Sequence, residues 1–287
     1  MGPILLFSAA ALWGLIGPLS KLIFAGGMLP LETAFWRGSF AGLAFFIHWL
    51  FNRHPLPCSL KQITAIVLFG LFGVALLEGS FVYAVSYGGA ALASVLLYSA
   101  PIWVNIAGVL FFKESIPLKQ RLSLSLAFSG VLGICLWGGN ADFSAPALVW
   151  GLLSGLSYAS FYISGKVFFR HTHPVVVYMI AFPVASLAIL SVILITSPSS
   201  VSETVSHLVS LKAETITASL LMGLVCTYLP YLLYGAGLKL VETSRAAIMT
   251  MVEPVVSVAI AAVMWGELFS VQGYLFAALV IIGVAMA

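Results

Sequence analysis

The sequence predicts an all-α integral membrane protein with ten transmembrane helices, arranged as two inverted five-helix repeats. Three observations predict this fold: the composition, the number of long apolar segments, and a pattern of residues that occurs twice. Of the 287 residues, 62% are hydrophobic and only 7% are charged, whereas about 25% of the residues of a soluble domain are charged. So few charges cannot cover a water-facing surface, and most of the surface must therefore face lipid.

Ten segments are apolar over about the 20 residues that a helix needs to cross a bilayer. They are residues 3–25, 31–51, 62–86, 89–112, 121–138, 146–169, 174–196, 214–237, 244–266 and 270–287. Short polar connections join them, and the longest connection, residues 197–214, has room for a short interfacial helix. The first segment lacks the positively charged start of a signal peptide, so we expect it to be a retained span.

Lysine and arginine are unevenly distributed between the connections. If every segment crosses the membrane, nine of them fall on one side: Arg53, Lys61, Lys113, Lys119, Arg121, Lys166, Arg170, Lys239 and Arg245. The other side holds Lys21 and Lys212. Because positive residues accumulate in cytoplasmic loops, the sequence predicts a multi-pass protein of the inner (cytoplasmic) membrane with both termini in the cytoplasm.

A repeat appears when the chain is shifted against itself by 153 residues, or by 145 residues near the first span. The matching pairs are Pro101–Pro254, Glu114–Glu267, Leu122–Leu275 and Gly130–Gly283 at the first shift, and Lys21–Lys166 and Phe24–Phe169 at the second. The two shifts differ by about the extra length of the 197–214 connection. They indicate one five-span repeat that occurs twice, at residues 1–138 and 146–287. Because five is odd, the second copy enters the membrane from the opposite side, as in secondary transporters.

Three features carry a resemblance to a known family: "ALWGLIGPLSK" in the first span, a proline thirteen residues before a glutamate in spans 4 and 9, and a glycine near the end of spans 5 and 10. In these features the chain resembles the drug/metabolite transporter (DMT) superfamily, in its EamA-type branch of ten-helix transporters. The resemblance implies a carrier of small organic solutes, often an exporter of amino acids or other metabolites. The high aromatic content is similar to that of the YddG-type aromatic amino-acid exporters. The corresponding stretch of span 6, "GLSYASFYISGK", lacks the tryptophan and proline of that motif, so a role of Trp13 or Pro18 would belong to one half only.

The sharpest functional candidate is Glu253. It lies about nine residues, or roughly 14 Å, into span 9. A charge at that depth is costly to place in the membrane, and such residues are therefore usually functional. Pro254 removes a backbone donor and leaves a carbonyl of the preceding turn free. A carboxylate beside such a turn suits a substrate ammonium or a coupled proton, although it would equally well hold neighbouring helices together. Its repeat partner is Ala100, so the two halves share the proline and differ in the charge.

Aromatic and polar side chains at mid-depth form a second group of substrate-binding candidates. They are Trp13, Tyr98, Trp103, Asn105, Tyr158 and Tyr231. Aromatic rings suit aromatic or cationic substrates, but tyrosine and tryptophan also form interfacial belts. Asn105 has a second interpretation as a hydrogen bond to a neighbouring helix. We interpret Pro101 and Pro254 as hinge or kink points rather than ligands.

Two more charges lie within the spans, at Arg37 and Glu78. An ion pair between them, or an arginine that extends to the interface, explains Arg37 without a ligand. Glu78 remains a substrate-binding candidate. Neither charge forms part of a catalytic cluster in the sequence.

The sequence predicts neither an enzyme nor a cofactor or metal site. It contains no G-x-x-x-x-G-K-[ST] loop for ATP and no H-E-x-x-H metal motif, and Asp142 is its only aspartate. The predicted partners are the lipid bilayer and a small-molecule substrate, with protons as a candidate coupling ion and without nucleic acid. The leading function is export of amino acids (aromatic or hydrophobic) or related metabolites by alternating access. The alternatives are another solute in the same fold, such as a drug cation, nucleoside base or sugar, and a channel.

Overall fold

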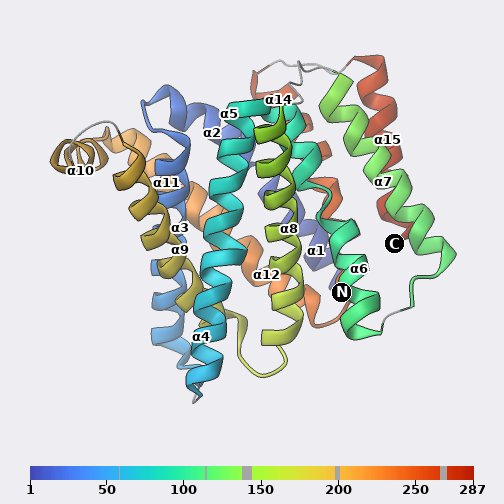
Figure 1. Cartoon of the computed structure of the whole chain (residues 1–287), viewed down its shortest axis with the longest axis horizontal. Helices are drawn as coiled ribbons and strands as arrows, with labels where there is room; N and C mark the ends of the chain where they lie inside the picture. Colours follow the sequence, from blue (N-terminus) through green and yellow to red (C-terminus); the bar gives the residue numbers. More distant parts are fainter. Residues whose placement is uncertain (58, 114, 138–143, 198–200, 266–269) are drawn as a thin grey trace.

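The computed structural model is a bundle of long helices (Figure 1). It describes residues 1–57, 59–113, 115–137, 144–197, 201–265 and 270–287. Over this part of the chain the regular structure is helical and contains no strand. Seven of its helical segments are long and apolar enough to cross a membrane. The predicted all-helical, multi-pass fold is confirmed. Asp142 and the last residues of the predicted spans 5 and 9 lie outside the described residues.

The first half provides the helices that correspond to the predicted spans 1 to 5. They are α1 (Gly2–Trp13), α2 (Ile16–Ala25), α3 (Pro30–Asn52), α4 (Leu60–Phe69), a π-helical segment (Gly70–Ala75), α5 (Leu76–Leu97), α6 (Ala100–Phe112) and α7 (Leu118–Trp137). Within α5, Gly89 has φ 77° and ψ 162°. Only glycine adopts this conformation without strain, and it makes the turn between spans 3 and 4.

The second half repeats this order after the connection at residues 138–144. Its elements are α8 (Ala145–Phe168), α9 (Pro174–Thr196), α10 (Val201–Val209), α11 (Ala213–Gly223), a π-helical segment (Leu224–Tyr228), α12 (Leu229–Leu238), α13 (Thr243–Met249), a 3₁₀ turn (Thr250–Val252), α14 (Glu253–Trp265) and α15 (Val271–Met286). In Figure 1, α3 runs downward and its counterpart α9 runs upward. The two halves therefore cross in opposite directions.

The two repeats are interleaved. The most extensive helix contacts join α5 to α8, α7 to α15, α3 to α9 and α1 to α12. Span 1 thus packs on span 8 and span 6 on span 3, which are equivalent pairs when the halves are exchanged. Spans 2 and 7, and spans 5 and 10, are paired with their own counterparts. This pattern is what a pseudo-two-fold axis between two inverted repeats produces.

Small residues set the distance between α7 and α15. A Cβ added at Gly283 would lie 2.5 Å from the backbone nitrogen of Ala127, and one added at Gly130 would lie 2.6 Å from the carbonyl oxygen of Phe276. Ser123 donates a hydrogen bond across the interface to the Gly283 carbonyl at 2.6 Å. Glycine and serine at helix crossings in lipid allow such close backbone approach. The glycines of the repeat pattern therefore act in packing.

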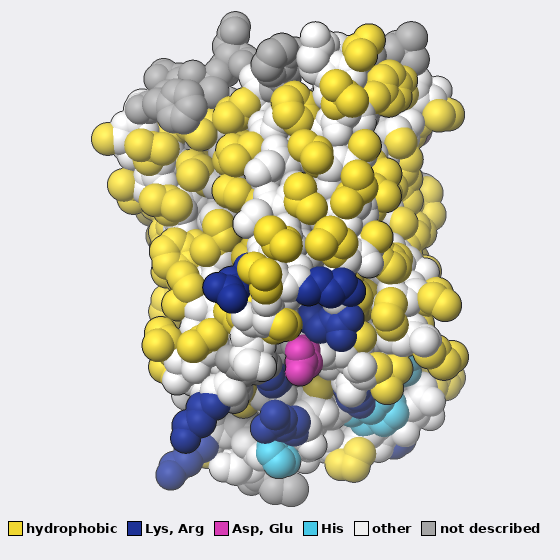
Figure 2. Space-filling model, turned by 90° about the vertical axis from the view of Figure 1, so that its right-hand side faces the viewer, with side chains coloured by type: hydrophobic (Ala, Val, Ile, Leu, Met, Phe, Trp, Pro, Cys, Tyr) yellow, Lys and Arg dark blue, Asp and Glu magenta, His cyan; other side chains and the backbone are white. Residues whose placement is uncertain are grey.

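Positive charge gathers at one end of the bundle. The connections that follow α3, α6 and α8 all lie at the lower end of Figure 1. On the face shown in Figure 2, lysine and arginine side chains lie in the lower half, while the upper half is apolar. Below, we call these the basic end and the opposite end of the molecule.

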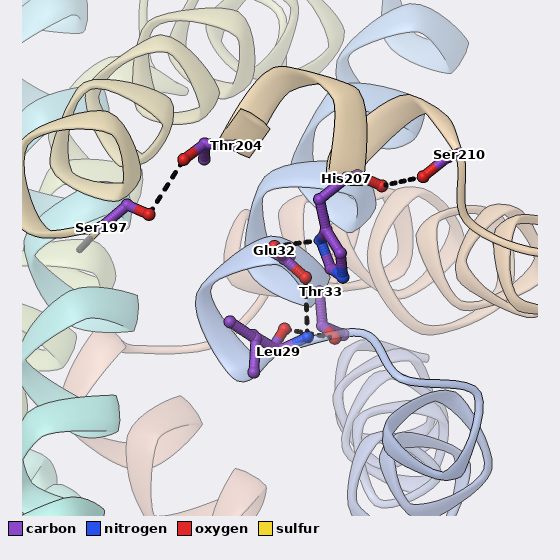
Figure 3. A network of polar contacts seen from close by, with 7 residues as sticks. All are labelled: Leu29, Glu32, Thr33, Ser197, Thr204, His207 and Ser210. Carbon is purple, nitrogen blue, oxygen red and sulfur yellow. Dashed lines mark hydrogen bonds and ion pairs between the residues drawn. The ribbon is translucent and has the colours of Figure 1, made fainter. Parts of the chain in front are cut away.

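The predicted short helix in the 197–214 connection is α10, at the opposite end. It is tied to the start of α3 by His207, whose Nδ1 lies 3.1 Å from the carboxylate of Glu32 (Figure 3). The other carboxylate oxygen of Glu32 accepts the backbone N–H of Leu29 at 2.8 Å. Thr204 of α10 donates to Ser197 at 2.9 Å. One carboxylate thus caps α3 and anchors α10.

Candidate functional site

Helix interruptions position the candidate site. Span 4 breaks at Tyr98 and Ser99, between α5 and α6, and span 9 passes through the 3₁₀ turn Thr250–Val252 before α14. Each break lies just before the proline that the two repeats share, Pro101 or Pro254. Spans 3 and 8 carry the equivalent π-helical segments, and span 1 breaks between Trp13 and Ile16. Discontinuous helices in paired positions are typical of transporter binding sites.

Glu253 is the first residue of α14, at the break in span 9. Its carboxylate accepts a hydrogen bond from the hydroxyl of Tyr98, at the break in span 4. The broken spans of the two repeats therefore meet through this bond. Tyr162 reaches the same break, because its hydroxyl lies 2.6 Å from Oγ1 of Thr250. The interaction satisfies part of the carboxylate's hydrogen-bonding capacity, and its remaining lone pairs are available to a cation or a proton.

Some of the tyrosines that interact with this carboxylate belong to a cluster of aromatic rings. The centre of the cluster is Phe161, whose ring contacts those of Trp13, Tyr158, Tyr231 and Tyr234 at centroid distances of 5.2–6.3 Å. Three of the predicted residues, Trp13, Tyr158 and Tyr231, therefore belong to one cluster. Tyr158 and Tyr231 also interact electrostatically with Glu253. In this conformation the rings pack against one another edge to face, tilted or, for Phe161 and Tyr234, stacked.

Trp103 and Asn105 lie on α6, beyond the break in span 4. The indole N–H of Trp103 donates to Oγ of Ser99 at 3.1 Å, and its side chain packs against the large hydrophobic core of which the aromatic cluster is a part. The amide of Asn105 donates to the Pro101 carbonyl at 2.8 Å and accepts from Gln120 at 3.0 Å. Asn105 therefore joins α6 to α7, as in its interpretation as a contact between helices.

Arg37 and Glu78 form the predicted ion pair, which is confirmed. Their side chains are 12% and 24% exposed. Arg37 also interacts electrostatically with Tyr231 and Glu253, so the pair and the carboxylate belong to one electrostatic region. With every group ionised, this region carries one more negative than positive charge. It favours the entry of a cation or of a proton.

Buried hydroxyls near the cluster have no hydrogen-bond partner within the described part of the chain. They belong to Tyr178, Ser186, Thr227 and Tyr234. The ring of Tyr178 meets that of Tyr231 edge to face, and the ring of Tyr234 lies tilted against that of Trp13. Ser186 lines a small cavity beside Arg37 and Glu78. Because unsatisfied buried groups are costly, these hydroxyls fit a region that holds water or a polar ligand during its working cycle.

Sequence reasoning did not single out Phe161 or Tyr178, although both are almost fully buried in the cluster. The spacing of Tyr158, Phe161 and Tyr162 along one helical face was the available signal for Phe161.

The sequence also gave no sign of a stack of histidine rings at the basic end. The ring centroids of His54 and His173 lie 3.6 Å apart, and the two rings are nearly parallel. Nδ1 of His48 forms a hydrogen bond with the Tyr228 hydroxyl at 2.7 Å. Among the described residues, no group of three histidine, cysteine or acidic side chains is arranged to hold a metal.

Comparisons with known proteins agree with this architecture. A solved structure named "Crystal structure of protein" superposes with a TM-score of 0.80, covers 99% of this chain and 96% of its own, and is 14% identical, which shows a shared fold. A "Probable amino-acid metabolite efflux pump" of Escherichia coli is 26% identical over 98% of this chain and 92% of its own length. The protein of the same name in Salmonella typhimurium is 28% identical over 68% of each chain. An "Uncharacterized transporter" of Archaeoglobus fulgidus is 25% identical over 72% of this chain and 70% of its own.

The profile of one protein family matches the chain twice, once in each half. It covers residues 1–136 and 145–287, and its description is "EamA-like transporter family". The double match, the interleaved repeats and the paired helix breaks describe the same architecture. This chain is a multi-pass membrane transporter and not an enzyme, and it belongs to the EamA-like transporter family of the drug/metabolite transporter superfamily.

Proposed function

We propose that the protein exports amino acids with aromatic or hydrophobic side chains, or related small metabolites, across the cytoplasmic membrane by alternating access. The observation that carries the proposal is the bond between Glu253 and Tyr98, which joins the broken spans of both repeats inside an aromatic cluster. The carboxylate binds the substrate ammonium, and the rings of Trp13, Tyr158 and Tyr231 bind its apolar part. The names of the Escherichia coli and Salmonella typhimurium relatives support this class of substrate.

The packed cluster assigns a physical step to the transport cycle. A substrate enters only when the rings that meet at Phe161 separate, and their closure behind it restores the ring contacts. Pro101 and Pro254 lie beside the breaks where each half changes direction, and we propose that they act as the hinges. The two repeats, at residues 1–138 and 146–287, then move as the two halves of a rocking carrier.

Proton coupling follows from the same carboxylate. If Glu253 binds either a proton or the substrate ammonium, the two compete, and a proton moving inward drives a substrate outward. A proton would neutralise the one negative charge that remains when Arg37 and Glu78 are paired, whereas the ammonium of an amino acid would pair with the Glu253 carboxylate directly. This mechanism requires the basic end to face the cytoplasm, as the positive-inside rule predicts.

A substrate panel in proteoliposomes tests the proposal. Vesicles loaded with radiolabelled phenylalanine, tryptophan or leucine should release them saturably. An outside medium more acidic than the vesicle interior should accelerate this release, because protons then move inward as the substrate moves outward. Counterflow exchange would establish a carrier, because a channel does not exchange one solute for another. Saturable transport of drug cations, nucleoside bases or sugars, without transport of the amino acids, would replace the proposed substrate class.

The variant Glu253→Gln keeps the shape and the hydrogen bond from Tyr98 but removes the charge. It should abolish transport or its dependence on pH, while the protein is still extracted as a single species. The matched control is Glu242→Gln, which removes an exposed carboxylate at the basic end. If Glu253→Gln transports normally at every pH while Glu253→Ala unfolds, Glu253 serves only to hold the helices together.

A further inference from the structure

A groove on the flank of the bundle lies outside the aromatic cluster. It has a volume of about 270 Å³, just below the range of small-molecule pockets, which begins at about 300 Å³. Its walls come from the π-helical segment and α5 on one side, from α9 on the other, and from the first turns of α3 and α8. Its lining includes Phe72, Gly79, Tyr83, Trp150, Ile189 and Val192.

The chemistry of the groove is that of a hydrocarbon site. Its lining is apolar or aromatic except for Ser80, whose hydroxyl already donates to the Leu76 carbonyl at 2.6 Å. It opens on the lipid-facing surface, because Phe72 and Val192 on its rim are 57% and 36% exposed. Ile189 in its floor is 4% exposed. The groove therefore leads from the lipid-facing surface to a side chain that is otherwise buried.

Its length and its orientation match one leaflet. Leu71 and Tyr83, at its two ends, are twelve residues apart, or about 18 Å along the helix. One leaflet of the hydrocarbon core is about 15 Å thick. Tyr83 and Trp150 close the end that is farther from the basic end, with ring centroids 5.1 Å apart. Tyrosine and tryptophan prefer the level of the lipid headgroups, so the groove runs from that interface toward the bilayer centre.

Its depth arises from two local features. The π-helical segment Gly70–Ala75 changes the direction in which Leu71, Phe72 and Ala75 point, and π-helical turns occur mostly at functional sites. Gly79 supplies the space, because a Cβ added there would meet no atom within 4 Å. At the helix crossings described above, glycines instead face closely packed neighbours. No neighbouring atom therefore requires a glycine at position 79, and the absence of a side chain there leaves open space in the groove.

We propose that this groove is a binding site for a single acyl chain of a phospholipid in the leaflet opposite the basic end, with its headgroup beside Tyr83 and Trp150. The site is independent of the proposed amino-acid export. A bound chain lies against α5, the helix that carries Glu78 and its ion pair with Arg37. A lipid chain is the occupant that fits best, because the lining is apolar and the exposed rim residues Phe72 and Val192 lie on the lipid-facing surface.

Photolabelling separates a bound chain from ordinary lipid contact. The protein is reconstituted in vesicles of palmitoyl-oleoyl phosphatidylethanolamine and phosphatidylglycerol, with a trace of phosphatidylcholine that carries a diazirine in its acyl chain. Labelled residues are mapped by mass spectrometry. Ordinary contact labels residues according to their exposure, so Leu187, which is 63% exposed on the same helix, would exceed the buried Ile189 by far. A chain in the groove labels Ile189 at least as strongly as Leu187.

Two variants fill the groove from opposite walls. Gly79→Leu and Val192→Trp should each reduce labelling of Ile189 several-fold and leave Leu187 unchanged, in protein that elutes as a single species. Either variant alone is sufficient if the other fails to fold. The proposal is overturned if Ile189 is labelled only in proportion to its exposure, or if a filled groove leaves its labelling unchanged. It is also overturned if phenylalanine or another transported solute removes the label, since the groove would then belong to the solute pathway.

Discussion

The ion pair between Arg37 and Glu78 allows a quantitative test of whether two intramembrane charges act in stability or in transport. The perturbations are Arg37→Met, Glu78→Gln and the two together. Breaking a buried pair costs about 3–5 kcal/mol, because one charge stays behind without a partner. The side chains here are 12% and 24% exposed, which places the expected cost near the lower limit. About 3 kcal/mol raises the ratio of unfolded to folded protein by roughly a hundredfold.

The two single variants should not be equal. Arg37→Met leaves a carboxyl group that can take up a proton, whereas Glu78→Gln leaves a guanidinium that keeps its charge. Glu78→Gln is therefore the more destabilising change. The double variant leaves neither member of the pair charged, and replacing a buried pair by neutral groups is often close to neutral. We expect it to regain most of the lost stability.

Reversible unfolding in mixed micelles measures the three free energies, and transport in proteoliposomes is measured on the same preparations. If the pair only holds α3 to α5, the double variant recovers both stability and transport. If it recovers stability without transport, one of the charges acts in the cycle. Additive losses in the double variant would refute the reasoning, since they would show that the two side chains do not stabilise each other.

Three further predictions concern orientation, affinity and pH. Single cysteines at Arg53, Lys119 and Arg170 should react with impermeant reagents from the cytoplasmic side and one at Asp142 from outside; reaction of position 142 from the cytoplasm would contradict the inverted repeat. Alanine at Trp103, Tyr158 or Tyr231 should weaken substrate affinity by up to roughly tenfold, since a ring contact is worth about 0.5–1.5 kcal/mol, with less effect on thermal unfolding; unchanged affinity in all three would make them packing residues. Burial and the neighbouring His54 lower the pKa of His173, outside the spans, from 6.5 to about 4, so its contribution to stability should be complete above about pH 6.5 and be lost as the pH falls toward 4. His173→Asn keeps an acceptor at the start of α9 and should flatten this part of the stability profile, whereas a profile that equals the wild type would exclude His173 as its cause.

The spans could be predicted from the sequence because hydropathy is a local property. A run of apolar residues must lie in lipid whatever its neighbours are, so the predicted ranges and the observed helices agree. The pairing of Arg37 with Glu78 was accessible for a similar reason, since few charges lie within the spans and each needs a partner. The match of Pro101 with Pro254 correctly located the two regions where spans 4 and 9 are interrupted.

The arrangement inside the bundle depends on which faces of distant helices meet, and the sequence does not contain that information locally. Phe161 is one of 20 phenylalanines, and its central place results from the crossing of α1, α8 and α12. The stack of His54 on His173 joins a loop of the first repeat to the start of a helix of the second. Asn105 had two interpretations, and only the position of Gln120 shows the contact that it makes.

The pairing of α7 with α15 has a consequence for biosynthesis. The two helices fit each other at Gly130 and Gly283, where there is no room for a side chain, yet they are separated by most of the second repeat. A ribosome therefore releases α7 into the membrane long before its partner exists, and during that interval lipid must cover the glycine surface. The fifth span completes its packing only after α15 has been inserted, so the first half of the chain cannot complete its fold before the second half is made.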